Sequence, residues 1–322
     1  MDDLTTLLHD AVEDVEPTDR LVAIRQRTRK PSRRRWYAAG GALLATAAVV
    51  TGVAVANWPS DDRRAGVTDD PTASVSPEPA GTARAVYYLG DTPGGLRLFR
   101  EFHLVPDNPS RLGAELVTTP PYDPDYSTAW PQDAFLSTAV DYPRGQINVQ
   151  LSGAWLHDRP AGMSALQARL ALEQVIYTVQ AYAQEPLPVQ FRLRGNPVDQ
   201  VYGLPTGEPL TASRQVDVLA PVSVSNPVEG RLVEDHFSAD GVAMSFEGTV
   251  PWKLRDAEGN VVDEGFATGT FDPDRLTPWE TGDIDVSGLP PGTYTFVART
   301  DDPSGGAEGS GPTSDTRTVR IR

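Results

Sequence analysis

The four histidines are the side chains of this chain best suited to move protons or hold a metal ion near neutral pH. They are His9, His103, His157 and His236, and none lies in an H-E-x-x-H or Cys/His pattern of the kind that binds zinc. His157 is followed directly by Asp158, and such a pair could form half of an acid–base couple. A histidine beside an aspartate in a surface loop is the commoner explanation, so we predict no catalytic role for it.

The segment from Asp283 to Gly288 has the D-x-D-x-S-G pattern that opens a calcium-binding loop. Such a loop needs a bidentate carboxylate at its twelfth position, where this chain has Tyr294. We therefore predict a strand end followed by a turn. The Asp-Pro-Asp sequences at 123–125 and 272–274 are also predicted to form turns, because aspartate and proline favour them.

Several tryptophans could stack on sugar rings and so form a glycan-binding face. The four considered are Trp130, Trp155, Trp252 and Trp279. Trp252 has the spacing of a core residue in a strand, whereas Trp130 and Trp279 stand beside prolines and are the better candidates for exposure. The alternative is that each ring anchors a loop to its own domain.

Motifs for other kinds of catalysis are missing from the sequence. There is no nucleophile elbow, no Walker loop and no dinucleotide-binding fingerprint after a strand. The chain has no cysteine, which excludes disulfides, thiol catalysis and cysteine-ligated zinc. We predict that the protein is not an enzyme and has no catalytic residue, cofactor or metal. A cell-wall hydrolase is the weakest alternative, because it needs at least one poised pair of carboxylates in a cleft, and the sequence does not show one.

Charge and length limit the partners. The 322 residues suffice for two or three domains, and the formal net charge is −16 at pH 7. A strongly acidic protein repels phosphate backbones, so we predict no binding of nucleic acid.

An uncharged apolar run from Trp36 to Ala56 is long enough to cross a bilayer as a helix. Arg33, Arg34 and Arg35 precede it, and basic flanks stay in the cytoplasm. We predict a cytoplasmic tail at 1–35, a transmembrane helix at 36–56 and an extracytoplasmic remainder. The alternative is a signal peptide cleaved after Ala56.

The sequence also predicts the character of the segments on either side of this helix. Residues 4–15 place leucines and valines on one helical stripe, which could touch the membrane surface or dock on a cytoplasmic partner. The second possibility would make the protein a transmembrane regulator that signals through its N-terminal helix. Residues 57–82 are rich in Pro, Ser, Thr and Asp, and are predicted to be a disordered linker.

Residues 83–205 combine strand and helix signals and predict an α+β domain with helices on one face of a sheet. Its clearest element is a helix that starts with a Ser164–Gln167 capping box and ends before Pro186. Residues 214–322 carry short strands between turns and predict a β-sandwich of immunoglobulin type. The first of its predicted strands covers residues 216–219.

Two sets of segments have the character of known families. The first set comprises 86–89, 147–152, 168–182 and 187–191, and through it residues 83–205 resemble the GerMN domain of bacterial sporulation and spore-germination proteins. The second set comprises 226–230, 245–254 and 292–296, and through it residues 216–322 are similar to the immunoglobulin-like domain of bacterial spore germination. The resemblance implies a membrane-anchored envelope protein without catalytic residues. We expect its exterior to bind a protein or cell-wall partner.

Overall fold

The computed structural model describes residues 81–105, 113–301 and 311–322, all of which belong to one compact unit. The predicted tail 1–35, the predicted transmembrane helix 36–56 and nearly all of the predicted linker 57–82 lie outside the described residues. Within the described ranges, no helix is both long and apolar enough to cross a membrane.

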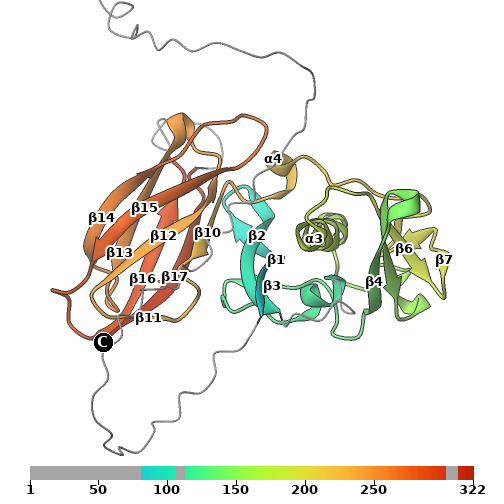
Figure 1. Cartoon of the computed structure of the whole chain (residues 1–322), viewed down its shortest axis with the longest axis horizontal. Coiled ribbons are helices and arrows are strands. Elements are labelled where there is room, and N and C mark those ends of the chain that lie inside the picture. Colours follow the sequence, from blue (N-terminus) through green and yellow to red (C-terminus); the bar gives the residue numbers. More distant parts are fainter. Residues whose placement is uncertain (1–80, 106–112, 302–310) are drawn as a thin grey trace, which may run out of the picture. The chain divides into compact units, whose positions relative to one another are not determined.

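The first domain, residues 82–205, consists of two main sheets and one long helix (Figure 1). Strands β2, β1 and β3 form one sheet, β4, β5, β6 and β7 form the second, and β8 and β9 form a small hairpin. The elements are β1 (Thr82–Thr92), β2 (Gly95–Val105), the 3-10 helix η1 (Ala114–Thr118), β3 (Tyr126–Ser127), β4 (Phe135–Asp141), η2 (Tyr142–Arg144), β5 (Gln146–Leu151), η3 (Ala154–Leu156), α3 (Ala165–Ala183), β6 (Val189–Leu193), β7 (Asn196–Pro197), β8 (Gln200–Val201) and β9 (Leu204–Pro205).

Helix α3 lies between the two main sheets and organises the first domain (Figure 1). The predicted capping box is confirmed: the Gln167 N–H donates to Ser164 Oγ at 3.1 Å, and the Ser164 N–H donates to Gln167 Oε1 at 2.9 Å. The prediction of helices on one face of a single sheet is wrong. Because α3 is apolar and buried around most of its circumference, it needs an apolar layer on both sides.

The second domain, residues 222–321, is a β-sandwich (Figure 1). A sheet of order β10-β12-β15 and a sheet of order β11-β17-β16-β13-β14 share one apolar core, as the sequence predicted. The elements are β10 (Val222–Asn226), β11 (Arg231–Val233), β12 (His236–Ala243), the 3-10 helix η4 (Phe246–Gly248), β13 (Thr249–Arg255), β14 (Val261–Thr268), β15 (Thr277–Asp285), β16 (Gly292–Arg299) and β17 (Ser314–Ile321).

The segment between the domains differs from its prediction. Residues 216–219 were predicted as a strand, but α4 (Gln215–Val218) is a single helical turn closed by the Leu219 N–H, which donates to the Gln215 carbonyl at 2.8 Å. Val218 and Leu219 are buried against apolar residues of β1, β2 and α3. Leu219 pairs with Leu98 of β2 only as an isolated β-bridge, so the apolar residues of this segment fasten the connection to the first domain mainly by packing.

Candidate functional site: a buried polar junction and an open groove

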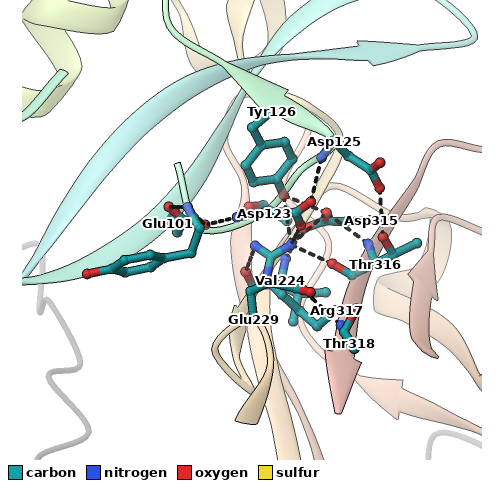
Figure 2. A network of polar contacts seen from close by, with 12 residues as sticks. Glu101, Asp123, Asp125, Tyr126, Val224, Glu229, Asp315, Thr316, Arg317 and Thr318 are labelled. Atoms are coloured by element: carbon teal, nitrogen blue, oxygen red, sulfur yellow. Dashed lines mark hydrogen bonds and ion pairs between the residues drawn. The ribbon is translucent and has the colours of Figure 1, made fainter. Parts of the chain in front are cut away.

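Arg317 of β17 is the centre of a buried polar cluster that joins the two domains (Figure 2). Only 2% of its surface is exposed. Its Nη1 lies 2.5 Å from Asp123 Oδ2, which belongs to the first domain, and 3.1 Å from Asp315 Oδ1 on its own strand. The predicted turn at 123–125 is confirmed, since the Asp125 N–H donates to Asp123 Oδ1 at 2.8 Å. The turn also supplies the carboxylate that meets the other domain.

Neutral groups complete the coordination of the guanidinium. Arg317 Nη1 donates to the Tyr126 hydroxyl at 3.0 Å, and Nη2 donates to the Val224 carbonyl at 2.7 Å. The Tyr126 hydroxyl and the Val224 N–H in turn donate to the two oxygens of Asp315, each at 2.5 Å. At the edge of the cluster, Thr316 Oγ1 donates to Asp125 Oδ2 at 3.0 Å. Groups from both domains therefore hold one another in place.

Two carboxylates share a single guanidinium in this cluster, and burial changes the protonation of both. Burial raises the pKa of Asp123 to about 7, although Arg317 opposes the shift. Burial also raises the pKa of Asp315. For Arg317 itself, burial favours the neutral form, but Asp315, Tyr126 and Asp123 together raise its pKa above the ordinary value. The guanidinium stays charged, whereas Asp123 can take up a proton near neutral pH.

Glu101 of β2 holds the turn at Asp123 in place through hydrogen bonds to its backbone (Figure 2). It accepts hydrogen bonds from the N–H groups of Tyr122 and Asp123, at 3.0 and 2.9 Å, and its Oε2 lies 2.6 Å from His103 Nε2. Burial alone would raise the pKa of Glu101, but these hydrogen bonds lower it. His103 is buried and stacks on Tyr122 with ring centroids 4.2 Å apart. This histidine therefore supports the junction and does not face solvent.

A second set of contacts joins β2 to the start of the sandwich. The Arg100 N–H donates to Ser223 Oγ at 3.0 Å, and Arg100 Nη2 donates to Ser225 Oγ at 2.6 Å. Close by, the Ala220 N–H donates to the Leu98 carbonyl at 2.8 Å. These bonds and the Arg317 cluster fix the sandwich to the first domain at separate points.

An open groove of about 440 Å³ lies on the first domain and includes His157. His157 Nδ1 lies 2.8 Å from Asp158 Oδ1, and Nε2 lies 3.7 Å from Asp199 Oδ1. The sequence places His157 beside Asp158 but gives no sign that Asp199 joins them. Among the residues that the structure describes, no group of three or more His, Asp or Glu side chains is placed to hold a metal ion.

The tryptophans are distributed differently from the prediction. Trp130 and Trp279, the favoured candidates for exposure, are buried at 2% and 3%, so that prediction is wrong. A neighbouring proline does not force exposure: Pro278 and Trp279 both lie within strand β15, and both tryptophan rings belong to the cores. Trp252 is a core residue, as predicted, and Trp155 is the exposed one, at 52%.

The remaining sequence candidates have structural roles, except for His9, which lies outside the described residues. His236 is exposed, with Nε2 3.8 Å from Asp285 Oδ1. Strand β15 ends at Asp285, whose Oδ1 accepts hydrogen bonds from the Ser287 N–H and hydroxyl, so the predicted strand end and turn are confirmed. The turn at 272–274 is also confirmed, because the Asp274 N–H donates to Asp272 Oδ1.

Comparison with known protein families agrees with the two-domain structure. Residues 85–199 match the family described as sporulation and spore germination, and residues 221–307 match the immunoglobulin-like domain of bacterial spore germination. The chain contains a GerMN domain followed by a germination-type immunoglobulin-like domain. This result confirms the resemblance found in the sequence.

One solved structure similar to this chain contains the tandem GerMN domains of the sporulation protein GerM from Bacillus subtilis. The sequence identity is 13% and the TM-score is 0.31. The match covers 65% of this chain and 62% of that one, so this chain spans less than two thirds of the length of the structure it matches. No curated protein sequence matches the chain.

The first prediction concerns Arg317. Arg317→Met should lower the free energy of unfolding by about 3–5 kcal/mol, because it leaves two buried carboxylates without their cation. Adding Asp123→Asn and Asp315→Asn should recover part of the loss. Arg320→Met, on an exposed position of the same strand, is the matched control and should change stability by less than about 0.5 kcal/mol. Equal urea-unfolding midpoints for the two single variants would contradict the structural role of the cluster.

The second prediction concerns pH. Folding raises the pKa of Asp123 from 3.8 to about 7, so in this window the folded protein keeps a proton that the unfolded chain has lost. Stability should therefore fall as the pH rises through the window, and Asp123→Asn should reduce that slope. Urea unfolding of both proteins at several pH values from 4 to 8 measures the effect. Parallel stability profiles for the two proteins would show that Asp123 does not titrate in this way.

Proposed function

We propose that the chain is a single-pass membrane protein whose GerMN and immunoglobulin-like domains lie outside the cytoplasm and act together as a non-enzymatic binding unit. The uncharged run from Trp36 to Ala56 and the three arginines before it support this orientation. The families of both domains are generally non-catalytic. The expected partner is an extracytoplasmic protein or the cell wall.

The observation that carries this proposal is the filled junction between the domains. Small-molecule sites often lie between domains, where a cleft buries the ligand. Here that position is occupied by Arg317, Asp123 and Tyr126, which are satisfied by one another and by their neighbours. The junction thus holds two binding modules together, and the outer surfaces of the domains are left for partners.

Two edge strands carry exposed apolar side chains that suit contact with a protein. Strand β14 is at the edge of the five-stranded sheet and exposes Phe266, while β4 is at the edge of its sheet and exposes Leu136. An edge strand offers unpaired backbone groups, and partners can add a strand there. These edges favour a protein partner for at least part of the surface.

The third prediction tests the membrane topology. In intact cells that express the full chain with different epitopes at its two ends, added protease should remove the C-terminal epitope and spare the N-terminal one. The arginines at 33–35 should set this orientation, so replacing all three with glutamate should reduce the accessible fraction. A protected C-terminal epitope, or a mature product that begins at Asn57, would contradict the anchored arrangement.

The fourth prediction tests binding by the exposed edge. A photo-crosslinking amino acid at Phe266 should join the protein on intact cells to one reproducible protein partner. The matched control places the same group at Glu258, an exposed residue in the turn between β13 and β14. The same products from both positions, or none from Phe266, would count against a protein partner at this strand.

A further inference from the structure

The groove beside His157 has the position and dimensions of a ligand site. It lies where β5 and β6, which pair in parallel, reach their carboxyl ends at Leu151 and Leu193. In open α/β sheets, ligands bind in the crevice outside the carboxyl ends of the parallel strands, and the groove has the corresponding position beside the one parallel pair of this mixed sheet. Its volume of about 440 Å³ is in the range of small-molecule pockets. Pro197 and Val198 extend its apolar wall.

Three polar side chains, those of His157, Asp158 and Asp199, also line the groove. His157 stands between the carboxylates of Asp158 and Asp199, and its carbonyl accepts hydrogen bonds from the Gly203 N–H at 2.9 Å and from Gln200 Nε2 at 3.3 Å. The β8–β9 hairpin therefore fixes the backbone that carries the imidazole. Both carboxylates are largely exposed, and a carboxylate has about four lone-pair sites, so each has acceptor capacity left for a ligand.

An exposed aromatic ring adjoins the groove. Trp155 is the exposed member of the four tryptophans that the structure describes. Its ring lies against Gly153, which lines the groove: a Cβ added there would be 2.4 Å from the indole Cδ1 and Nε1. Only glycine at this position lets the ring pack so closely against the chain. An indole offers a flat apolar face on which another ring can stack, and its N–H is a hydrogen-bond donor.

These features together select one class of ligand. A sugar ring has an apolar C–H face that can stack on an indole and hydroxyl groups that can donate to carboxylates. Phosphates and other anions are disfavoured, because Asp158 and Asp199 are negative and the chain as a whole carries a net charge of −16. The apolar wall suits a small substituent such as an acetyl methyl group.

We propose that this groove, with Trp155 at its border and Asp158 and Asp199 as acceptors, binds a neutral carbohydrate. The site deepens the proposed function, because it rests on a binding unit that faces the cell wall. It gives that unit a glycan contact on the GerMN domain, separate from the protein-binding edge proposed for β14.

The fifth prediction tests this site on the purified full chain in detergent, so that the result does not depend on membrane topology. The N-acetylglucosamine trimer is titrated by calorimetry and by ligand-observed NMR. Trp155→Ala should weaken binding at least about tenfold, and Asp199→Asn should weaken it without changing the thermal unfolding midpoint. Tyr142→Ala, which removes an exposed aromatic ring near the opposite end of β5, should bind as the wild type does.

Several outcomes would overturn the proposal. These are absence of trimer binding to the wild type, equal weakening by Tyr142→Ala and Trp155→Ala, and binding of a lysine-rich peptide at the groove in place of the sugar. If the trimer does not bind but the C-terminal domains are accessible on cells, the glycan site is wrong and the proposed location stands. If the trimer binds but the domains are protected on cells, the glycan site stands and the proposed location is wrong.

Discussion

A guanidinium that is removed from water must find its hydrogen-bond partners and its counter-charge within the protein, and Arg317 finds them partly in the other domain. A buried charge without a partner costs several kcal/mol. The sandwich supplies Asp315 and the Val224 carbonyl, but Asp123 and the Tyr126 hydroxyl come from the GerMN domain. Separation of the domains would leave this charge incompletely satisfied, so the junction is part of the folded state.

The junction also holds the two domains in a fixed position relative to each other. The connecting segment is buried on β2 and α3, and the Arg317 cluster closes the contact from the far end of the sequence, near the C-terminus. The two modules are therefore fastened at separate points and do not hang on a flexible tether. The surfaces of the two modules are therefore held in a fixed relation. For the binding unit proposed above, this preorganisation would lower the entropic cost of contacting both modules at once.

The sequence predicted the local elements better than the contacts between domains. The Ser164–Gln167 capping box set the start of α3, and the short strands between turns after residue 214 correctly predicted a sandwich. The strand expected at 216–219 became a helical turn because apolar residues of the first domain bury Val218 and Leu219. Packing against residues distant in sequence determined the conformation of this segment, and a local sequence pattern does not reveal such contacts.

The candidate sites were harder to predict, although one signal was present. In β17, strand alternation places Asp315 and Arg317 on the same face as the core residue Val319, which marks two charges directed inward. Their partner Asp123 lies 194 residues before Arg317, and no local pattern connects the two. The groove likewise combines His157 with Asp199, whose proximity depends on the return of the chain through β6 and β7. The junction forms only when the two domains meet, and the groove forms only when the whole GerMN domain has folded.

The central claim, that Arg317 fastens the domains into one body, can be tested by a distance measurement. The chain has no cysteine, so cysteines introduced at the exposed positions Leu136 and Phe266 would be the only sites for spin labels. Pulsed electron paramagnetic resonance should then give one narrow distance distribution between the GerMN domain and the sandwich, and Arg317→Met should broaden it. A distribution that is already broad with Arg317 in place, or one that Arg317→Met leaves unchanged, would contradict the account.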